Sequence, residues 1–174
     1  MFVAPASMAD FDAMPVTDAA AELLPCCASR RWINELVNRR PYGSLDALTA
    51  ASDAVLAGLS WADVEEALAA HPRIGERSIG ERTLEQRRED AWSRQEQSGV
   101  RPADGEIEVA LREGNVAYEE HFGHVFLINA TGLSGGQMLA ALRARLGNPP
   151  DVERAVVRTE LIKIVRLRLA KALR

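Results

Sequence analysis

Only one run of the sequence has the composition of a β-strand, and this scarcity constrains the fold more than any other feature. The run is HVFLINATG over residues 124–132, which is rich in β-branched and aromatic residues and lies between Gly123 and Gly132. The chain offers no second convincing strand to pair with it. We therefore expect an extended connector near residues 124–131 rather than a sheet. Its backbone N–H and C=O groups must then find other partners, of which a ligand is one.

The rest of the chain shows helical periodicity, with apolar residues three and four positions apart. We expect Ser44, Ser60 and Ser134 to be N-caps, and Asp63 to complete a capping box with Ser60. Helices are expected over residues 18–29, 30–40, 44–59, 60–71, 91–100, 106–122, 134–147 and 151–174, with a loop and a charged helix over 73–90. Further caps are expected at Thr17 or Asp18 and at Asp104.

These signals predict an all-α fold. We expect a single-domain bundle of about eight helices over residues 1–174, with one extended connector and a flexible segment over residues 1–10. A length of 174 residues suits one domain, and 47% hydrophobic residues suit a globular protein. No apolar run approaches the roughly 20 residues that a membrane-spanning helix requires, so no membrane partner is expected.

The net charge and the cysteines exclude other classes. A formal net charge of −4 argues against a nucleic-acid partner, because binding to phosphates requires a basic surplus. Cys26 and Cys27 are neighbours and cannot link distant parts of a fold, so we expect them to fill the core. Together with the absence of a signal-peptide pattern, they indicate a reducing, cytoplasmic setting.

Three histidines are candidates for chemistry. His71 precedes Pro72 at the end of a helical pattern, where it is either a structural helix-end residue or a titratable group at a site. His121 and His124 are three positions apart, but Gly123 separates them and no acidic or cysteine cluster completes a ligand set. We therefore expect no metal site.

A basic residue interrupts the apolar stripe of the last helix. At about 100° per residue, Arg168 lies between Ile164 and Leu161, whereas Arg166 lies toward the outer side. A buried guanidinium keeps its charge and needs an anion or several acceptors. A structural salt bridge and a bound substrate carboxylate both satisfy this need.

One turn of the segment SRQEQSGV carries Ser93, Glu96 and Gln97. These side chains offer a hydroxyl, a carboxylate and a carboxamide, which suit a small polar ligand rich in N–H and C=O groups. The alternative is an ordinary solvated helix face.

Four motifs carry a family resemblance, and the first three of them are specific when taken together. HPRIG at 71–75, SRQEQSG at 93–99, GNVAYEEHFGHVFLINATG at 114–132 and KIVRLRL at 163–169 resemble the 2-oxo-4-hydroxy-4-carboxy-5-ureidoimidazoline (OHCU) decarboxylase family of urate breakdown. The resemblance covers nearly the whole chain, in the family's order. It implies one all-helical domain that needs no cofactor. Departures from the family's pattern are the SGV sequence at 98–100 and Asn129.

The resemblance also implies roles for individual residues. It makes His71 and Glu96 catalytic residues and Arg168, rather than Arg166, the arginine of the pocket. The substrate-binding residues that it implies are Pro72, Ser93, Gln97, Arg168 and, through their backbone, Phe126, Leu127, Ile128, Asn129 and Ala130.

The implied reaction is the cofactor-independent decarboxylation of OHCU to (S)-allantoin, with stereospecific protonation by a histidine. The implied partners are this ureidoimidazoline substrate, a second copy of the chain in a homodimer, and urate oxidase and hydroxyisourate hydrolase as upstream enzymes. Three alternatives stay open: a non-enzymatic helical module, an enzyme of the same fold acting on a different ureide, and a metal-dependent ureide hydrolase using His121 and His124.

Overall fold

The computed structural model describes residues 5–74, 84–99 and 105–174. Within these ranges the chain forms helices and no β-strand, which confirms the all-α prediction. The helices are α1 (Met8–Ala13), α2 (Val16–Leu23), α3 (Arg30–Asn38), α4 (Leu45–Gly58), α5 (Trp61–Ala69), α6 (Leu84–Glu96), α7 (Gly105–Phe122), α8 (Gly135–Arg145) and α9 (Pro150–Ala172). None of these helices is both long and apolar enough to cross a membrane.

The N-caps follow the predicted serines. The hydroxyls of Ser44, Ser60 and Ser134 each accept a hydrogen bond from the backbone three residues later, and Ser60 forms the predicted capping box with Asp63. The expected cap at Thr17 or Asp18 is wrong. Helix α2 begins at Val16, because the carbonyl of Pro15 already accepts hydrogen bonds from the N–H groups of Asp18 and Ala19.

Several helix boundaries differ from the predictions. Helix α2 ends at Leu23 rather than at residue 29, because Pro25 cannot continue a helix, and α6 ends at Glu96 rather than at residue 100. Helix α6 runs without interruption over Leu84–Glu96, across the expected division at residue 90, because this stretch contains no glycine or proline. Helix α9 begins at Pro150, where proline at the first helical position loses no hydrogen bond. The expected cap at Asp104 lies outside the described residues.

The N-terminal helix α1 was not expected. Ser7 and Asp10 form a capping box at its start, and Phe11 is fully buried. The backbone N–H of Met8 donates to the carbonyl of Arg174, and Arg174 donates to Ala6. We expected a flexible segment over residues 1–10, but residues 5–10 have a defined arrangement. The backbone of residues 173 and 174, at the C-terminal end of α9, supplies their hydrogen-bond partners.

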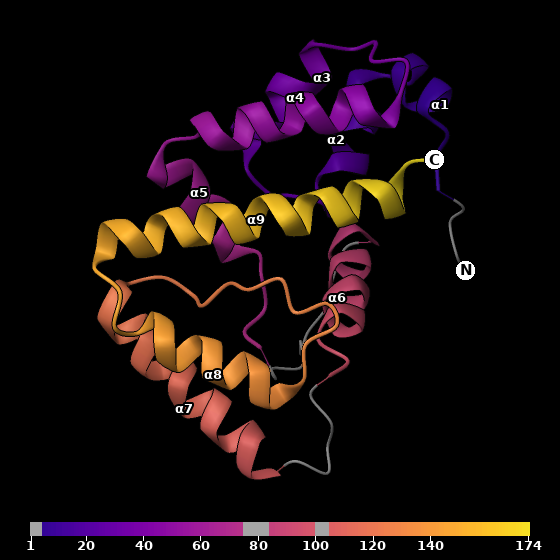
Figure 1. The fold of residues 1–174 in the computed structure, drawn as a ribbon. Coiled ribbons are helices and arrows are strands. Elements are labelled where there is room, and N and C mark those ends of the chain that lie inside the picture. Colours follow the sequence, from indigo (N-terminus) through magenta and orange to yellow (C-terminus); the bar gives the residue numbers. More distant parts are fainter. Residues whose placement is uncertain (1–4, 75–83, 100–104) are drawn as a thin grey trace.

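The last helix organises the fold (Figure 1). Helix α9 packs against α2 and α4 on one side, while α7 and α8 pack together on its other side. The connector after α7 runs between α9 and α8 toward α6, which lies beside the C-terminal half of α9. This layout brings the connector, α6 and α9 into one region of the molecule.

Among the described residues the buried apolar side chains form two clusters, and the connector lies at their boundary. The side chain of Leu127 belongs to the larger cluster, which surrounds α9. Phe126 and Ala130 belong to the smaller cluster between α7 and α8, and Ile128 packs against it. Because successive side chains of an extended backbone point to opposite sides, the connector fills both clusters. This explains a strand-like composition in a segment that pairs with no strand.

Candidate active site

The side chain of Arg168 is enclosed by acceptors. It is 1% exposed, and it makes five hydrogen bonds, which matches its five N–H groups. Nε and Nη2 donate to the two oxygens of Glu96, each at 3.2 Å, and Nη2 also donates to Ser93 Oγ at 3.0 Å. Nη1 donates to the Pro25 carbonyl at 3.2 Å and to Glu89 Oε1 at 3.3 Å. The predicted burial of Arg168 is confirmed, and of its two alternatives the structure shows the ion pair.

Arg166 has a different environment. Its Nε and Nη2 donate to the carboxylate of Asp53, and the side chain is 54% exposed. The helical wheel therefore separated the two arginines correctly, since residues two positions apart on a helix point in different directions.

Helix α6 supplies three of the partners of Arg168. Glu89, Ser93 and Glu96 follow one another at spacings of four and three residues, which places them on one face of the helix. The sequence identified Ser93 and Glu96 but missed Glu89, whose position in a charged stretch carries no distinguishing signal. Gln97 follows the helix and is partly buried, and its N–H donates to the Ser93 carbonyl.

Burial and charge act in opposite directions on the ion pair. Burial raises the pKa of Glu89 to about 7, although the charge of Arg168 and its hydrogen bond oppose this rise. Burial would lower the pKa of Arg168, but the carboxylates of Glu96 and Glu89 outweigh it and raise that pKa. Lys171 Nζ lies 3.7 Å from Glu96 Oε1 and brings a second positive charge to this carboxylate.

His71 lies just after α5, near enough to Arg168 for the charge of the guanidinium to act on its imidazole. Its backbone N–H donates to the Leu68 carbonyl, and the residue is 8% exposed. Burial lowers the pKa of the imidazole well below 6.5, and the positive charge of Arg168 lowers it further. His71 is therefore a neutral imidazole at pH 7. Its neighbour Pro72 is partly buried.

Side chains from α8 and α9 hold the connector. Arg145 Nη1 donates to the Leu127 carbonyl at 2.7 Å, and its guanidinium lies 4.5 Å from the centroid of the Phe126 ring. Glu160 Oε2 accepts from the N–H of Asn129 at 2.7 Å. Two of the backbone groups that required partners thus find them in side chains. Binding of a ligand by the backbone of residues 126–130 stays a prediction.

Arg145 is itself held by a buried carboxylate that sequence reasoning missed. Its Nε donates to Glu153 Oε1 at 2.8 Å, and Glu153 has no exposed surface. The hydroxyl of Tyr118 and the amide of Asn148 also donate to Glu153. Burial raises the pKa of Glu153, but these hydrogen bonds outweigh it and lower the pKa below its usual value. Arg145 is only eight residues from Glu153, but the two lie on different helices, α8 and α9, so no periodicity within one helix could identify the pair.

The far end of the connector meets the end of α6. The N–H of Gly135 donates to the Gly99 carbonyl at 3.2 Å. A Cβ atom on Gly99 would lie only 1.8 Å from the Leu133 carbonyl oxygen, so only glycine permits this approach. The contact fixes α6, with Ser93 and Glu96, relative to the connector.

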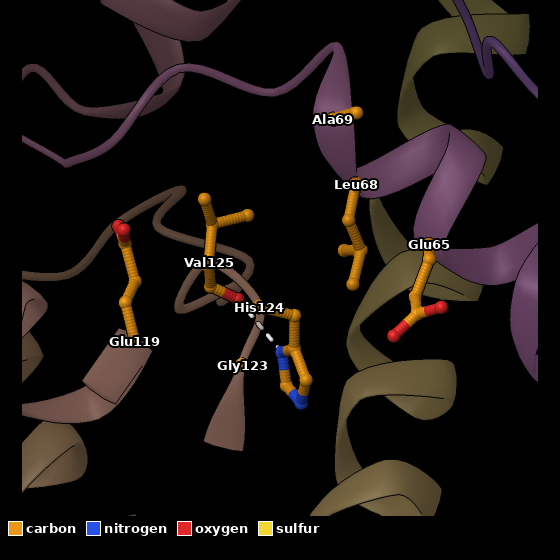
Figure 2. Close-up of a pocket in the computed structure, with 7 residues that line it drawn as sticks. All are labelled: Glu65, Leu68, Ala69, Glu119, Gly123, His124 and Val125. Carbon is orange, nitrogen blue, oxygen red and sulfur yellow. Dashed lines mark hydrogen bonds between the residues drawn. The ribbon is translucent and has the colours of Figure 1, made fainter. Parts of the chain in front are cut away.

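A pocket of about 350 Å³ lies at the other end of the connector (Figure 2). His124 contributes its ring, whose Nδ1 lies 3.1 Å from the Val125 carbonyl oxygen. The ring of His124 packs edge-on against Trp61, whereas that of His121 packs against Phe122. The lining residues are Glu65, Leu68, Ala69, Glu119, Gly123, His124 and Val125. None of them belongs to the predicted decarboxylase site, and only His124 was named in one of the alternatives.

The adjacent cysteines fill the core, as predicted. Cys26 and Cys27 are at most 1% exposed, and burial raises the pKa of both thiols to about 12. They are therefore protonated and unreactive at neutral pH.

Fold and site together define the class of protein: an all-α domain in which a neutral histidine lies beside a buried arginine held by a serine and two carboxylates. The family model of OHCU decarboxylase matches residues 12–170. The chain belongs to the OHCU decarboxylase family, a family of carboxy-lyases of urate degradation. The resemblance found in the sequence motifs is thereby confirmed.

Curated relatives agree with the family match. The 2-oxo-4-hydroxy-4-carboxy-5-ureidoimidazoline decarboxylase of Amia calva is 31% identical over 150 residues, covering 85% of this chain and 80% of that protein. The Mus musculus protein of the same name is 29% identical over 154 residues, covering 87% and 81%. The uric acid degradation bifunctional protein TTL of Arabidopsis thaliana is 32% identical over 146 residues, but this chain spans only 44% of its length.

Solved structures share the fold. A crystal structure of OHCU decarboxylase in the presence of (S)-allantoin aligns with a TM-score of 0.73 at 27% identity, covering 87% of this chain and 96% of that one. A crystal structure of (S)-allantoin synthase aligns with a TM-score of 0.67 at 20% identity, covering 96% of this chain and 54% of that one. The second likeness concerns the fold alone.

Proposed function

We propose that the chain converts OHCU to (S)-allantoin by a decarboxylation that needs neither a metal nor an organic cofactor. The observation that carries this proposal is the neutral, buried imidazole of His71 beside Arg168, which Ser93 and Glu96 hold in place. The relatives named for this activity, and a solved relative with (S)-allantoin, support the choice of substrate and product.

The substrate can accept the electrons itself. It carries a carboxylate and a hydroxyl on one ring carbon, next to a C=N bond. When the bond to the carboxylate breaks, CO₂ leaves and the electron pair forms a double bond between the two ring carbons. The former C=N nitrogen becomes negatively charged and takes a proton from solvent. A cofactor that serves as an electron sink is therefore unnecessary.

The remaining step moves one proton. The hydroxyl loses its proton to become the carbonyl of allantoin, and the neighbouring carbon, which bears the ureido group, gains one. A neutral imidazole can accept the first proton and return it to the carbon. His71 has this protonation state at pH 7. Because it lies on one side of the bound ring, the new stereocentre has a single configuration.

The other residues position the substrate. Glu96 orients the imidazole or accepts from a ureido N–H, while Ser93 and Gln97 bind polar atoms of the ureide. Pro72 and the backbone of residues 126–130 form the pocket wall. Arg168 binds an oxygen of the ring or the carboxylate. A tight grip on the carboxylate would stabilise the ground state and slow its loss, so Arg168 contributes chiefly to placement.

The proposal extends to partners and location. The protein acts as a homodimer in the cytoplasm, on a substrate supplied by urate oxidase and hydroxyisourate hydrolase.

The test converts urate with these two upstream enzymes in a cuvette and records circular dichroism. Rapid appearance of the (S)-allantoin signal on addition of the protein is the expected result. If only slow racemic decay follows, the substrate assignment is wrong, and related carboxylated ureides are assayed next.

A further inference from the structure

Nothing can reach Arg168 without displacing one of its present partners. The side chain is 1% exposed, and its five hydrogen bonds already use all its N–H groups. If a substrate oxygen binds to this guanidinium, a protein acceptor must first leave. The geometry indicates which one leaves at the lowest cost.

The four partners differ in how firmly they are held. Glu96 accepts two hydrogen bonds from Arg168 and lies near Lys171. Ser93 and the Pro25 carbonyl are neutral, and Pro25 contributes main chain that cannot swing away. Glu89 accepts a single hydrogen bond, which at 3.3 Å is the longest of the five. Of the two carboxylates that face Arg168, Glu89 is therefore held by fewer hydrogen bonds.

Repulsion between carboxylates also favours the displacement of Glu89. Arg168 already faces two carboxylates, Glu89 and Glu96. A substrate carboxylate would be a third anion around one buried cation, and like charges in a weakly polar interior repel strongly. Loss of the charge on Glu89 removes this repulsion. Burial already favours the neutral acid, since it raises the pKa of Glu89 to about 7.

Other charged groups around Glu89 belong to several elements. The charges of Asp90 and Glu96 on α6 favour its neutral form, whereas Arg168 on α9 favours the carboxylate. The groups that surround this cluster are Arg88 with its partner Glu22, the protonated thiols of Cys26 and Cys27, the neutral His71, and Lys171 beside Glu96.

We propose that Glu89 occupies, in the free protein, the place on Arg168 that the carboxylate of an anionic ureide takes on binding, and that Glu89 leaves this place as a neutral acid. Binding of the anion is then coupled to the uptake of one proton. The proposal rests on the proposed function for the nature of the ligand. In this proposal the site accepts an anion only when the carboxyl group of Glu89 is protonated.

The coupling has a defined sign. Below pH 7 Glu89 is already protonated and an anion binds without proton uptake. Above pH 7 binding of the anion also requires Glu89 to take up a proton from solvent, so the affinity falls. For one coupled proton, affinity decreases by about tenfold from pH 6 to pH 8.

The test uses allantoate, a stable linear ureide with one carboxylate, and isothermal titration calorimetry at pH 6 and pH 8. Repeating each titration in buffers of low and high ionisation enthalpy gives the number of protons taken up. (S)-Allantoin, which has no carboxylate, is the control ligand. Glu89→Gln is the matched variant, because its amide keeps the size of the side chain but cannot titrate. Circular dichroism verifies its fold.

For the wild type we expect uptake of about one proton per allantoate at pH 8, close to none at pH 6, and affinity about tenfold weaker at pH 8. With (S)-allantoin, and with Glu89→Gln, uptake and pH dependence should disappear. Uptake that persists in Glu89→Gln would assign the proton to another group, such as His71, and overturn the proposal. A wild type that binds allantoate equally at both pH values, or at neither, would also overturn it.

These results do not depend on turnover. If the protein shows the Glu89-dependent proton uptake but forms no (S)-allantoin in the coupled assay, the proposed substrate is wrong and the coupling stands. If it forms (S)-allantoin without this uptake, the coupling is wrong and the proposed function stands.

Discussion

Glu96 and Arg168 are joined by two hydrogen bonds of 3.2 Å, from Nε to Oε1 and from Nη2 to Oε2. The two residues are 72 positions apart in the sequence, and both are at least nine-tenths buried. This contact links α6 to α9, so the same pair holds the fold together and places the polar groups of the candidate site.

Removal of the Glu96 carboxylate should destabilise the fold. Glu96→Ala leaves a buried guanidinium without its main partner, and we expect the free energy of unfolding to fall by about 3–5 kcal/mol. Asp53→Ala removes the exposed partner of Arg166 and should cost no more than about 1 kcal/mol. Urea denaturation of both variants measures the difference. Equal losses would mean that burial of the Glu96–Arg168 pair does not matter.

The buried ion pair of Arg145 and Glu153 should be equally sensitive to the loss of one partner. Arg145→Met leaves Glu153 buried without its cation and removes the donor to the Leu127 carbonyl, so we expect a loss of about 3–5 kcal/mol. Tyr118→Phe removes only one hydrogen bond to the Glu153 carboxylate and should cost about 1.5–3 kcal/mol. Thermal or urea denaturation compares the two. A small effect of Arg145→Met would show that the connector does not depend on this arginine.

Gly99 should tolerate no side chain. The Cβ atom of Gly99→Ala would collide with the Leu133 carbonyl, so α6 must shift, and we expect lower stability together with reduced activity. Gly58, at the end of α4, has open space around it, and Gly58→Ala should be neutral or stabilise by about 0.5–1 kcal/mol. Denaturation curves and the turnover assay test the pair. An active, fully stable Gly99→Ala would contradict the contact.

The imidazole of His71 should make stability depend on pH. Its pKa is lowered in the folded protein, so below about pH 6.5 the unfolded chain binds a proton that the folded chain does not. The contribution of His71 to the free energy of unfolding is therefore present in full above pH 6.5. It falls as the pH drops below that value, by about 1.4 kcal/mol per pH unit for one proton. Glu89 has the opposite sign between its unfolded pKa of 4.5 and about 7, because the folded protein binds its proton more tightly.

Comparison with His71→Asn isolates the contribution of the histidine. The difference in unfolding free energy between wild type and His71→Asn should shrink between pH 7 and pH 5.5, as the wild type loses the stabilisation that its neutral imidazole provides. A difference that stays constant over this range would mean that the pKa of His71 is not lowered.

Local signals predicted much of the fold. The serine caps at positions 44, 60 and 134 were identified because a cap depends on residues within one turn. The connector was recognised by its composition and by the lack of a partner strand. Helix α1 was missed although Ser7 and Asp10 form a local capping box, because its six residues are too few to show helical periodicity. Its backbone contacts with residues 173 and 174, at the other end of the chain, carry no local signal.

The site was predictable only in part. The helical wheel showed that Arg168 is buried, and the motif around residue 96 indicated polar groups on one turn. Whether these belonged together could not be deduced from spacing, because α6 and α9 meet only in three dimensions. Glu89, the Pro25 carbonyl and the Arg145–Glu153 pair were missed for the same reason.

The central claim is that His71 delivers a proton to one face of the substrate. It is tested most directly by the enantiomeric composition of allantoin formed from urate in the coupled assay, with wild type and with folded His71→Asn. We predict (S)-allantoin from the wild type, and slow formation of racemic product with the variant. Rapid formation of (S)-allantoin by His71→Asn would contradict the account, since another group would then supply the proton.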